Sequence, residues 1–478
     1  MGGGDQIVVI GAGPAGLCAA LELARHGLAA VVLDRNDRVG GLARTIWYRG
    51  YGFDVGPHRF YTKSREIARL WKEILGDDLR EVPRLTRIYY NGRFFHYPLK
   101  PLDVIFGLGP VTTLRAILSH AVERARPHRD EPANFEEWAV RQFGRVLYTI
   151  FFKAYTEKVW GIPCREIGRE WAGQRIRAFN LTDVILNAFG LKRRGARVVK
   201  SLVDRFYYPR LGAGQMHEAV AKRIRAAGGE ILLNTPVTGL ETAGDRIAAV
   251  RCGVGGERRI PAAHVFASAP ITALARALVP PPPPAIAAAA AALRYRTHIT
   301  VNLIAKGDRL FPDNWIYIHS PAVKIVRVAN YNNFSRDMVA KPGTSALSVE
   351  YFCAEGDELW RVDDAGLVAL AADEMERVGL LPRSWVLDGF VVREPDSYPM
   401  FYLGHQAQFR ALYDHLVRYR NLTLMGRAAL YRYHSQDHAM LTGLYAARNF
   451  LGLSAVDLFS VDSDPNYFEE VAGPSDPA

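Results

Sequence analysis

The chain has 478 residues, of which 49% are hydrophobic and 23% charged, and this composition excludes a disordered or fibrous protein. Its length predicts two or three domains with separate cores. The formal net charge of +11 favours an anionic ligand, a nucleic acid or a membrane surface as a partner. Because the basic residues are scattered rather than clustered, we expect a small anionic molecule and no nucleic acid.

The cysteines and the apolar runs bear on the cellular compartment. Cys18, Cys164, Cys252 and Cys353 stand far apart and form no CxxC pair. This pattern fits free thiols in a reducing cytoplasm and argues against a disulfide scaffold or a zinc site. No apolar run is long enough to span a bilayer, and glycines interrupt the first apolar stretch, which therefore does not predict a signal peptide. We expect a cytoplasmic protein without an integral membrane segment.

The N-terminal residues predict a dinucleotide-binding unit. Residues 7–10 form a β-branched run typical of a buried parallel strand, and residues 17–26 have helical spacing. Between them Gly11, Gly13 and Gly16 form a GxGxxG pattern, which allows a tight turn, close approach of a pyrophosphate and close packing of helix on strand. The helix N-terminus offers free N–H groups to the phosphates.

A second predicted strand, residues 30–33, ends in Asp34. An acidic residue at this distance after the glycines suits a ribose hydroxyl and disfavours a 2′-phosphate. The alternative is a glycine-rich turn that binds nothing. Strand, glycines, helix and acid occur here in the expected order, so we favour the dinucleotide site.

Two further motifs carry a resemblance to a known family. Val39-Gly40-Gly41-Leu42-Ala43-Arg44-Thr45 follows the acid, and Phe53-Asp54-Val55-Gly56-Pro57-His58 comes shortly after. Together they resemble the FAD-binding region of the amine oxidase, phytoene desaturase and protoporphyrinogen oxidase superfamily, whose fold UDP-galactopyranose mutase shares. The resemblance implies FAD as cofactor, with Gly41 and Arg44 among the residues that bind it and His58 beside the isoalloxazine. The alternative for the glycine pair is a surface turn.

The next part of the chain predicts a helix, a hairpin and a helical block. Residues 64–75 read as a helix, and residues 87–98 as an aromatic hairpin turning at Asn91-Gly92, which suits either core packing or the wall of a substrate pocket. Residues 101–189 have mainly helical patterns. The stretch 102–126 is amphipathic and basic; we expect it to pack on its own domain, with contact to a membrane surface as the alternative.

The rest of the chain predicts a return to the nucleotide-binding domain, then a second sheet. A helix at 216–227 and a strand at 230–233 are followed by Val237, which we assign to the cofactor site, and by a hairpin around Gly244. Three strands, 299–305, 325–329 and 346–352, predict the substrate-domain sheet. Near the end, a strand leads into Gly426 and Arg427, and His438 stands directly before a helix predicted at residues 439–450. We assign Gly426, Arg427 and His438 to the cofactor.

These elements predict an α/β fold with a discontinuous, Rossmann-like FAD-binding domain of the GR2 type, a helical insertion and a substrate-domain β-sheet. We expect the parts of the FAD-binding domain at 1–85, 196–275 and 396–460. The helical insertion is expected at 86–195, the sheet at 276–395 and a tail at 461–478.

A second set of motifs narrows the resemblance. Residues Ala154 to Gly161 resemble the Y-T-E-K-x-W-G segment of UDP-galactopyranose mutase, which implies that Tyr155 and Trp160 border a uridine-diphosphate site. Arg175 and Arg327 stand where the mutase has arginines that bind the substrate diphosphate as charge-assisted forks. Tyr398 belongs to a tyrosine-proline segment that the resemblance places near the substrate.

The chain also departs from the mutase pattern. Residues 56–62 read Gly-Pro-His-Arg-Phe-Tyr-Thr where the mutase has G-x-H-x-F-H-T, and Leu42 replaces the asparagine of its G-G-N segment. The latter change is closer to the oxidases and desaturases, and the aromatic-rich insertion is unusual for a mutase. The resemblance therefore leaves the substrate open.

The resemblance implies an FAD-dependent enzyme that acts on a nucleotide-diphosphate sugar through N5 of reduced flavin, with Arg175, Arg327 and His58 in catalytic positions. The alternative is an oxidoreductase that takes hydride from an apolar substrate, as protoporphyrinogen oxidases, desaturases and amine oxidases do. A third alternative is a flavoprotein that binds a partner or a lipid without catalytic turnover. The two arginines favour the sugar nucleotide, because a hydrocarbon offers them no charge.

We expect no metal, since His434 and His438 stand four residues apart without a third ligand. A homo-oligomer is left open.

Overall fold

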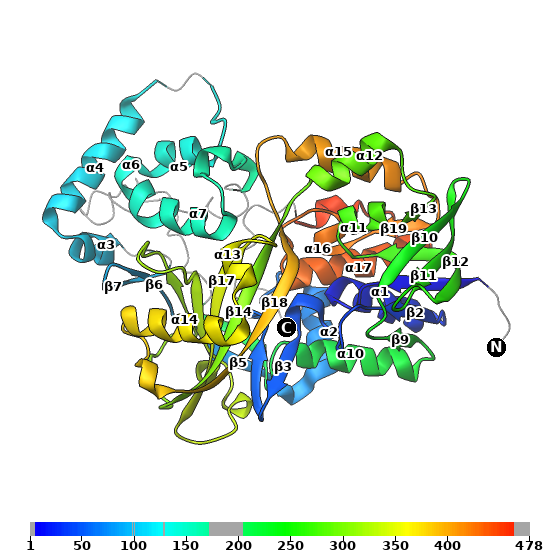
Figure 1. Cartoon of the computed structure of the whole chain (residues 1–478), viewed down its shortest axis with the longest axis horizontal. Coiled ribbons are helices and arrows are strands. Elements are labelled where there is room, and N and C mark those ends of the chain that lie inside the picture. The colour runs from blue at the N-terminus through cyan, green and yellow to red at the C-terminus, as the bar shows by residue number, and fades with distance from the viewer. Residues whose placement is uncertain (1–4, 98, 100, 128–129, 172–203, 463–478) are drawn as a thin grey trace.

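The computed structural model describes residues 5–97, 99, 101–127, 130–171 and 204–462, and two large β-sheets organise this part of the chain (Figure 1). The first sheet contains β1 (Gln6–Ile10), β2 (Ala30–Leu33), β9 (Glu230–Leu232), β10 (Val237–Ala243), β11 (Arg246–Cys252), β12 (Arg258–Ala267), β13 (Leu278–Val279) and β19 (Leu422–Leu424). Its order is β13-β10-β11-β12-β1-β2-β9, and β19 pairs with β12. The strands come from three separate stretches of the chain.

The centre of this sheet is parallel. β1 lies between β12 and β2, β19 runs parallel to β12, and Val8 is opposite both Val31 and Val265. Parallel strands end at one edge, and ligands of open α/β sheets bind outside that edge. Gly11 follows β1 there, Asp34 follows β2, and Ser268 follows β12.

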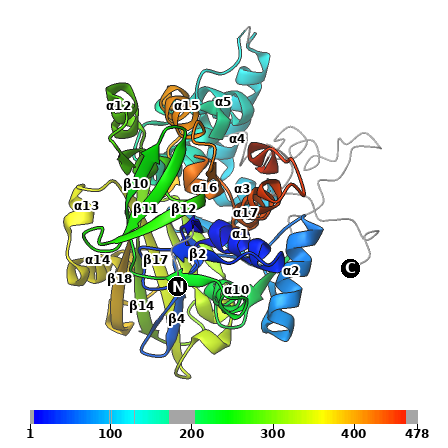
Figure 2. The same cartoon turned by 90° about the vertical axis from the view of Figure 1, so that its right-hand side faces the viewer.

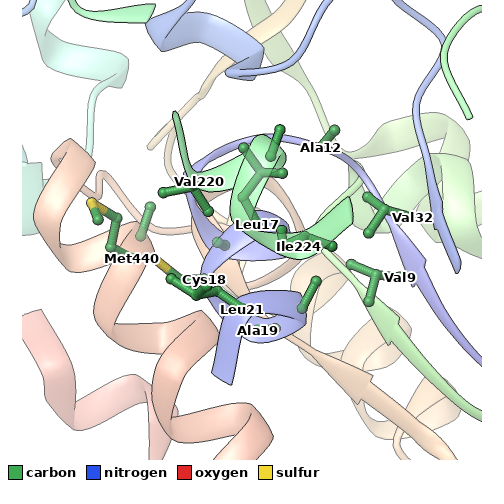
Figure 3. Packing of buried hydrophobic residues seen from close by; sticks show 14 of the residues in the cluster. Val9, Ala12, Leu17, Cys18, Ala19, Leu21, Val32, Val220, Ile224 and Met440 are labelled. Atoms are coloured by element: carbon green, nitrogen blue, oxygen red, sulfur yellow. The ribbon is translucent and has the colours of Figure 1, made fainter. Parts of the chain in front are cut away.

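Helix α1 (Pro14–Arg25) leaves that edge and packs between α10 (Gly214–Ala226) and α17 (Gln436–Phe450), as Figures 2 and 3 show. Leu17, Cys18 and Leu21 are buried in the shared core. Fully burying one such leucine contributes roughly 1.5–3 kcal/mol. The α1–α17 contact is close, since a Cβ on Gly443 would lie 2.0 Å from the Ala15 carbonyl oxygen.

The second sheet contains β6 (Thr86–Tyr90), β7 (Arg93–His96), β14 (Tyr295–Lys306), β15 (Trp315–Ile318), β16 (Arg327–Asn330), β17 (Thr344–Cys353) and β18 (Val386–Pro399). Its order is β18-β14-β17-β16-β15-β6-β7. The predicted hairpin turn is confirmed, with Asn91 and Gly92 both at positive φ. The β6–β7 hairpin joins this sheet through the parallel β6–β15 pair. Helix α14 (Asp364–Arg377) packs on β14 and β18.

The helical insertion lies at the upper left of Figure 1. It contains α3 (Pro101–Leu108), α4 (Pro110–Ala125), α5 (Phe135–Phe143), α6 (Arg145–Leu147), a π-helical segment (Tyr148–Lys153) and α7 (Ala154–Trp160). Its core is aromatic, with Phe135, Phe143 and Trp160 fully buried. Gly109, at φ 79°, and Pro110 split the expected helix into α3 and α4.

Smaller elements complete the fold. They are α2 (Arg65–Leu75), α11 (Ile271–Arg276), α12 (Pro284–Ala292), α13 (Glu358–Arg361), α15 (His405–Leu416), α16 (Gly426–Ala429) and the paired strands β3 (Thr45–Tyr48) with β4 (Tyr51–Asp54) and β5 (Leu79–Pro83) with β8 (Arg205–Pro209). The predicted α/β class is confirmed.

All four cysteines are buried free thiols. Within the described ranges no helix combines the length and the apolarity needed to cross a membrane.

Candidate active site

A bare-backbone surface lies at the N-terminus of α1. Gly11 has φ 103°, and a Cβ there would lie 2.3 Å from the Ser268 hydroxyl. Gly13 faces Gly41, whose Cα lies 3.8 Å from the place of a Gly13 Cβ. Gly16 is structural, since its Cβ would lie 1.8 Å from the Gly11 carbonyl oxygen. The residues therefore fit a dinucleotide pyrophosphate, because they offer backbone N–H groups without side chains in the way.

Asp34 ties this glycine loop to β2. Its Oδ2 accepts a hydrogen bond from the Ala12 N–H at 2.7 Å, and its Oδ1 accepts one from the Asn36 N–H at 2.8 Å. Oδ1 also accepts from the Asn36 side-chain amide at 3.0 Å, so Oδ2 is the oxygen that keeps a second acceptor position, and the ribose contact stays a prediction. The Thr235 N–H donates to the Asp34 carbonyl, which brings the segment before Val237 to this loop.

Arg44 connects the two halves of the molecule. Its Nη1 donates to the Gly41 carbonyl at 2.8 Å, and its Nη2 forms a buried ion pair with Glu394 of β18. The guanidinium is thus already neutralised by a carboxylate. The expected contact of Arg44 with the cofactor stays a prediction.

His58 is neutral in its turn after β4. Its Nδ1 lies 2.7 Å from the Gly56 carbonyl oxygen. A carbonyl can only accept, so Nδ1 carries the proton and Nε2 a lone pair. Burial, together with the charges of Arg327 and Arg427, lowers the pKa of His58 to about 3, against the Gly56 hydrogen bond.

Arg327 and Glu350 form an ion pair against that turn. The Arg327 Nη2 lies 2.6 Å from Oε2 of Glu350, and Nε also donates to the carboxylate. A Cβ on Gly56 would lie 3.5 Å from Nη2 and 3.2 Å from Oε1. Burial opposes the guanidinium charge, but Glu350 raises the pKa of Arg327 well above its ordinary value. Nη1 of Arg327 donates to no described residue.

Arg427 lies between two tyrosine rings. It follows Gly426, which opens α16 at φ 76°, and its Cζ lies 4.4 Å from the Tyr398 ring centroid and 4.5 Å from that of Tyr433. Its Nε is buried without a hydrogen-bond partner, and no carboxylate of the described residues pairs with it. Tyr398 is close to Arg327 as well, and burial raises the pKa of its hydroxyl. Tyr398 therefore contacts the guanidinium of Arg427 and lies within electrostatic range of that of Arg327.

An aromatic surface continues from Arg327 toward α7. Tyr317 on β15 is the cross-strand partner of Arg327 on β16. Tyr155 contacts the Tyr317 ring edge-on at 5.7 Å and stacks on His319 at 4.4 Å. Trp160 lies deeper, in the core of the insertion, with its ring 5.7 Å from that of Trp171.

Two predicted site residues remain, one assigned to the cofactor and one to catalysis. His438 is buried on α17, with Nδ1 2.9 Å from the Ser435 hydroxyl and the ring 6.0 Å from that of His434. Among the described residues no three His, Cys, Asp or Glu side chains are grouped as for a metal ion. Arg175 lies outside the described residues.

Lys158 is a site residue that the sequence reasoning missed. Its ammonium donates to the carbonyls of Ile318, Ser320, Val323 and Ile325 at 2.8–3.1 Å. Burial lowers the pKa of Lys158 to about 8. The side chain thereby fixes the segment between β15 and β16, and its last contact, Ile325, lies two residues before Arg327. The sequence did contain a signal for this role, since Lys158 stands between Tyr155 and Trp160 in the segment that resembles the mutase.

His298 was also missed. Its Nδ1 lies 3.0 Å from the Ser397 hydroxyl, which donates its proton to the Glu394 carbonyl. His298 must therefore donate from Nδ1, leaving a lone pair on Nε2. Burial lowers the pKa of His298 to about 3, with Arg327 and His58 nearby adding to the shift. No sequence motif marks His298, because it stands within an apolar run. The fold of the chain, through β14, brings it to the site.

Comparisons with known proteins agree with this arrangement. The family model described as "Flavin containing amine oxidoreductase" matches residues 14–451. A Klebsiella pneumoniae protein described as a probable UDP-galactopyranose mutase is 30% identical over 227 residues, covering 45% of this chain and 53% of its own. A lycopene-forming phytoene desaturase from Pantoea ananas is 23% identical over 264 residues, covering 51% of each chain.

Among solved structures, reduced UDP-galactopyranose mutase has a TM-score of 0.83 and 21% identity, covering 97% of this chain and 100% of that chain. At that identity the likeness concerns the fold alone. The chain aligns with about half the length of the two curated relatives.

Proposed function

The chain belongs to the flavin containing amine oxidoreductase family and is an FAD-dependent enzyme, and we propose that it acts on a nucleotide-diphosphate sugar at a site like that of UDP-galactopyranose mutase. The chemistry that FAD supplies in this proposal is nucleophilic attack by N5 of reduced flavin on the anomeric carbon. The protein's own contribution is to hold the diphosphate, the base and the sugar in place.

The observation that carries the proposal is the pair of arginines, Arg327 and Arg427, whose charges both act on Tyr398 and on His58. Nε of Arg427 is buried without a hydrogen-bond partner among the described residues. Arg327 is paired with Glu350 through Nε and Nη2, which leaves its Nη1 for a ligand. Leaving such a buried donor unpaired costs about 1–3 kcal/mol, so an anionic ligand gains what a hydrocarbon cannot offer. A diphosphate carries the oxygens and the charge that both guanidinium groups need.

The remaining residues have distinct roles in this proposal. Tyr155 and Tyr317 offer ring faces and edges to the nucleotide base. Glu350 holds the Nε–Nη2 edge of Arg327, so that Nη1 is the donor left for a phosphate oxygen. His58 is neutral and keeps its Nε2 as an acceptor near the reacting centre. No side chain is required as a nucleophile.

The second candidate is hydride transfer from an apolar substrate to oxidised FAD. Two observations favour it: Arg44 is already neutralised by Glu394, and Tyr97 of the aromatic hairpin segment reaches Tyr317 at 5.2 Å. An aromatic wall suits an isoprenoid or porphyrinogen. The same wall also suits a nucleobase, so the guanidinium groups decide our preference.

A UDP titration of the purified holoenzyme, followed by flavin absorbance, tests the proposal. Arg427→Ala and Arg327→Lys should each weaken UDP binding, by about 2–5 kcal/mol if the phosphate is buried. Arg393→Lys is the matched control, because Arg393 forms its ion pair with exposed Asp364. If UDP leaves the flavin spectrum and the melting temperature unchanged, the oxidoreductase reading takes its place.

A further inference from the structure

Helix α4 buries the polar side chains of His120 and Glu123 and exposes four of its large apolar side chains. The inward face consists of Ala116, His120 and Glu123, all of them buried. The outward face carries Val111, Leu114, Leu118 and Val122, which are 64%, 59%, 56% and 52% exposed. A surface helix of a water-soluble protein ordinarily has the opposite arrangement.

The exposed apolar residues form one continuous strip. Their spacing of three, four and four residues places them on a single face of α4. Phe106 of α3, 76% exposed, adds to them across the Gly109-Pro110 break. We call Phe106, Val111, Leu114, Leu118 and Val122 the α4 strip. In Figure 1 both helices lie at the left edge of the molecule, on the side away from the parallel sheet.

The exposed charge beside the α4 strip is positive. Arg115 is exposed on α4 next to Leu114 and Leu118. The single acid of α4, Glu123, is buried and pairs with Arg126 at 2.8 Å. At the other end, exposed Arg93 donates to the carbonyls of Phe106 and Gly107, which places a guanidinium beside α3. The strip is therefore flanked by arginines, without an exposed acid on its own helix.

We propose that the α4 strip docks this enzyme on the surface of a bilayer that contains anionic lipids. An apolar helix face flanked by arginines inserts into the boundary between headgroups and acyl chains, where the arginines meet lipid phosphates. A second copy of the chain fits less well, because a symmetric contact would bring Arg115 and Arg126 of both copies together. The net charge of +11 adds long-range attraction to an anionic surface.

This inference concerns a different surface from the proposed active site and stands without it. Helix α4 packs on α5 and α6, and α6 leads through the π-helical segment to α7, which carries Tyr155. Docking would therefore hold the helical insertion, and not the parallel sheet, against the lipid.

Vesicle flotation of the holoenzyme tests the proposal. The probes are vesicles of phosphatidylcholine alone and of an equimolar mixture with phosphatidylglycerol. We expect the wild-type protein to float with the mixed vesicles and much less with phosphatidylcholine. Leu114→Ser/Leu118→Ser should abolish flotation, and Arg115→Gln should weaken it about fivefold, the equivalent of about 1 kcal/mol per basic residue.

Val254→Ser is the matched control, because Val254 is 81% exposed at a loop far from α4 in sequence and outside the strip. It should float like the wild type. The leucines at 114 and 118 are more than half exposed, so the double variant should keep its FAD content and melting temperature. Those two readings separate loss of docking from loss of folding.

Three results would overturn the proposal. In the first, the wild type does not float with mixed vesicles, or the double variant floats equally well. In the second, the wild type fails to float and is a dimer by light scattering that the double variant dissociates, which assigns the strip to a second copy. In the third, the wild type fails to float and is monomeric, and the double variant has a lower melting temperature than the wild type. This result assigns the strip to contact with another segment of the same chain.

Discussion

The guanidinium of Arg327 and the carboxylate of Glu350 meet at 2.6 Å directly beneath the His58 turn. Glu350 is fully buried, whereas the arginine side chain keeps 18% of its exposure. The pair therefore presents one face of a guanidinium to the site and hides its counter-charge. The carboxylate fixes the orientation of the arginine and at the same time reduces the positive electrostatic potential that the arginine creates in the site.

We expect Glu350→Ala to lower the free energy of unfolding by about 3–5 kcal/mol, because it leaves the Arg327 charge without its buried partner. Urea denaturation of the holoenzyme measures this. Asp364→Ala is the control, since Asp364 is exposed and its pair with Arg393 should contribute no more than about 1 kcal/mol. Equal losses in the two variants would contradict the structural role assigned to Glu350.

Alanine substitutions at two glycines of the loop, Gly13 and Gly16, should have different effects, one on FAD binding and one on folding. Gly13→Ala has room within the protein, since the nearest described atom lies 3.8 Å from the new Cβ, but the methyl group would occupy the surface reserved for the pyrophosphate. We expect the variant to fold and to lose FAD. Gly16→Ala places a Cβ 1.8 Å from the Gly11 carbonyl oxygen and should not fold.

The measurement is FAD content after gel filtration together with the circular dichroism spectrum. A Gly13→Ala protein that retains stoichiometric FAD would show that the pyrophosphate binds elsewhere.

The stability of the helical insertion should be especially sensitive to replacement of Lys158. Lys158→Met leaves four carbonyls without their cationic donor, and we expect a loss of about 2–4 kcal/mol in unfolding free energy. Lys153→Met is the matched control, because Lys153 is half-exposed and pairs with Glu157 within the same helical region. It should cost less than about 1 kcal/mol.

Since Lys158 fixes the segment before Arg327, UDP affinity should also fall in Lys158→Met but not in Lys153→Met. A Lys158→Met protein with wild-type stability and wild-type UDP affinity would refute both parts of this prediction.

Asp54 gives the protein a pH-dependent stability. Burial raises the pKa of Asp54 from 3.8 to about 7, against hydrogen bonds from Thr45, Tyr208 and Ala213. Because the folded-state pKa is the higher one, this contribution is fully present below 3.8 and is lost as the pH rises through about 7. The loss amounts to at most roughly 4 kcal/mol.

Denaturation of wild type and Asp54→Asn across that pH range checks the sign. The difference between the two proteins cancels the opposite contribution of His58 and His298, whose lowered pKa values make stability fall as the pH falls below 6.5. We expect the wild type to lose stability relative to Asp54→Asn as the pH rises. A difference that is constant with pH would mean that Asp54 is ionised throughout.

Local patterns predicted much of the fold because they encode local interactions. The strand predicted at residues 7–10 and the glycine loop follow from short-range sterics, and α5 lies within the block predicted as helical, residues 101–189. The N-terminus of α2 is stabilised by the Ser64 side chain, which accepts from the Ile67 N–H. In each case the deciding contact lies within a few residues.

The missed features depend on contacts distant in sequence. Strand β18 is interrupted by a glycine, acids and a proline, and it forms because β14 supplies its hydrogen-bond partners. Lys158 acquires its role from carbonyls more than 150 residues away. For α4, periodicity predicted a helix correctly, but not which face is buried, because that depends on the polarity of the surface it meets.

The most direct test of the central claim is an isomerisation assay on UDP-sugars with the same holoenzyme preparation, oxidised and after dithionite reduction. We expect UDP binding and ring isomerisation in the reduced state alone, with activity strongly decreased in Arg427→Ala. Turnover of a porphyrinogen, isoprenoid or amine by the oxidised enzyme, with no response to any UDP-sugar in either state, would contradict it.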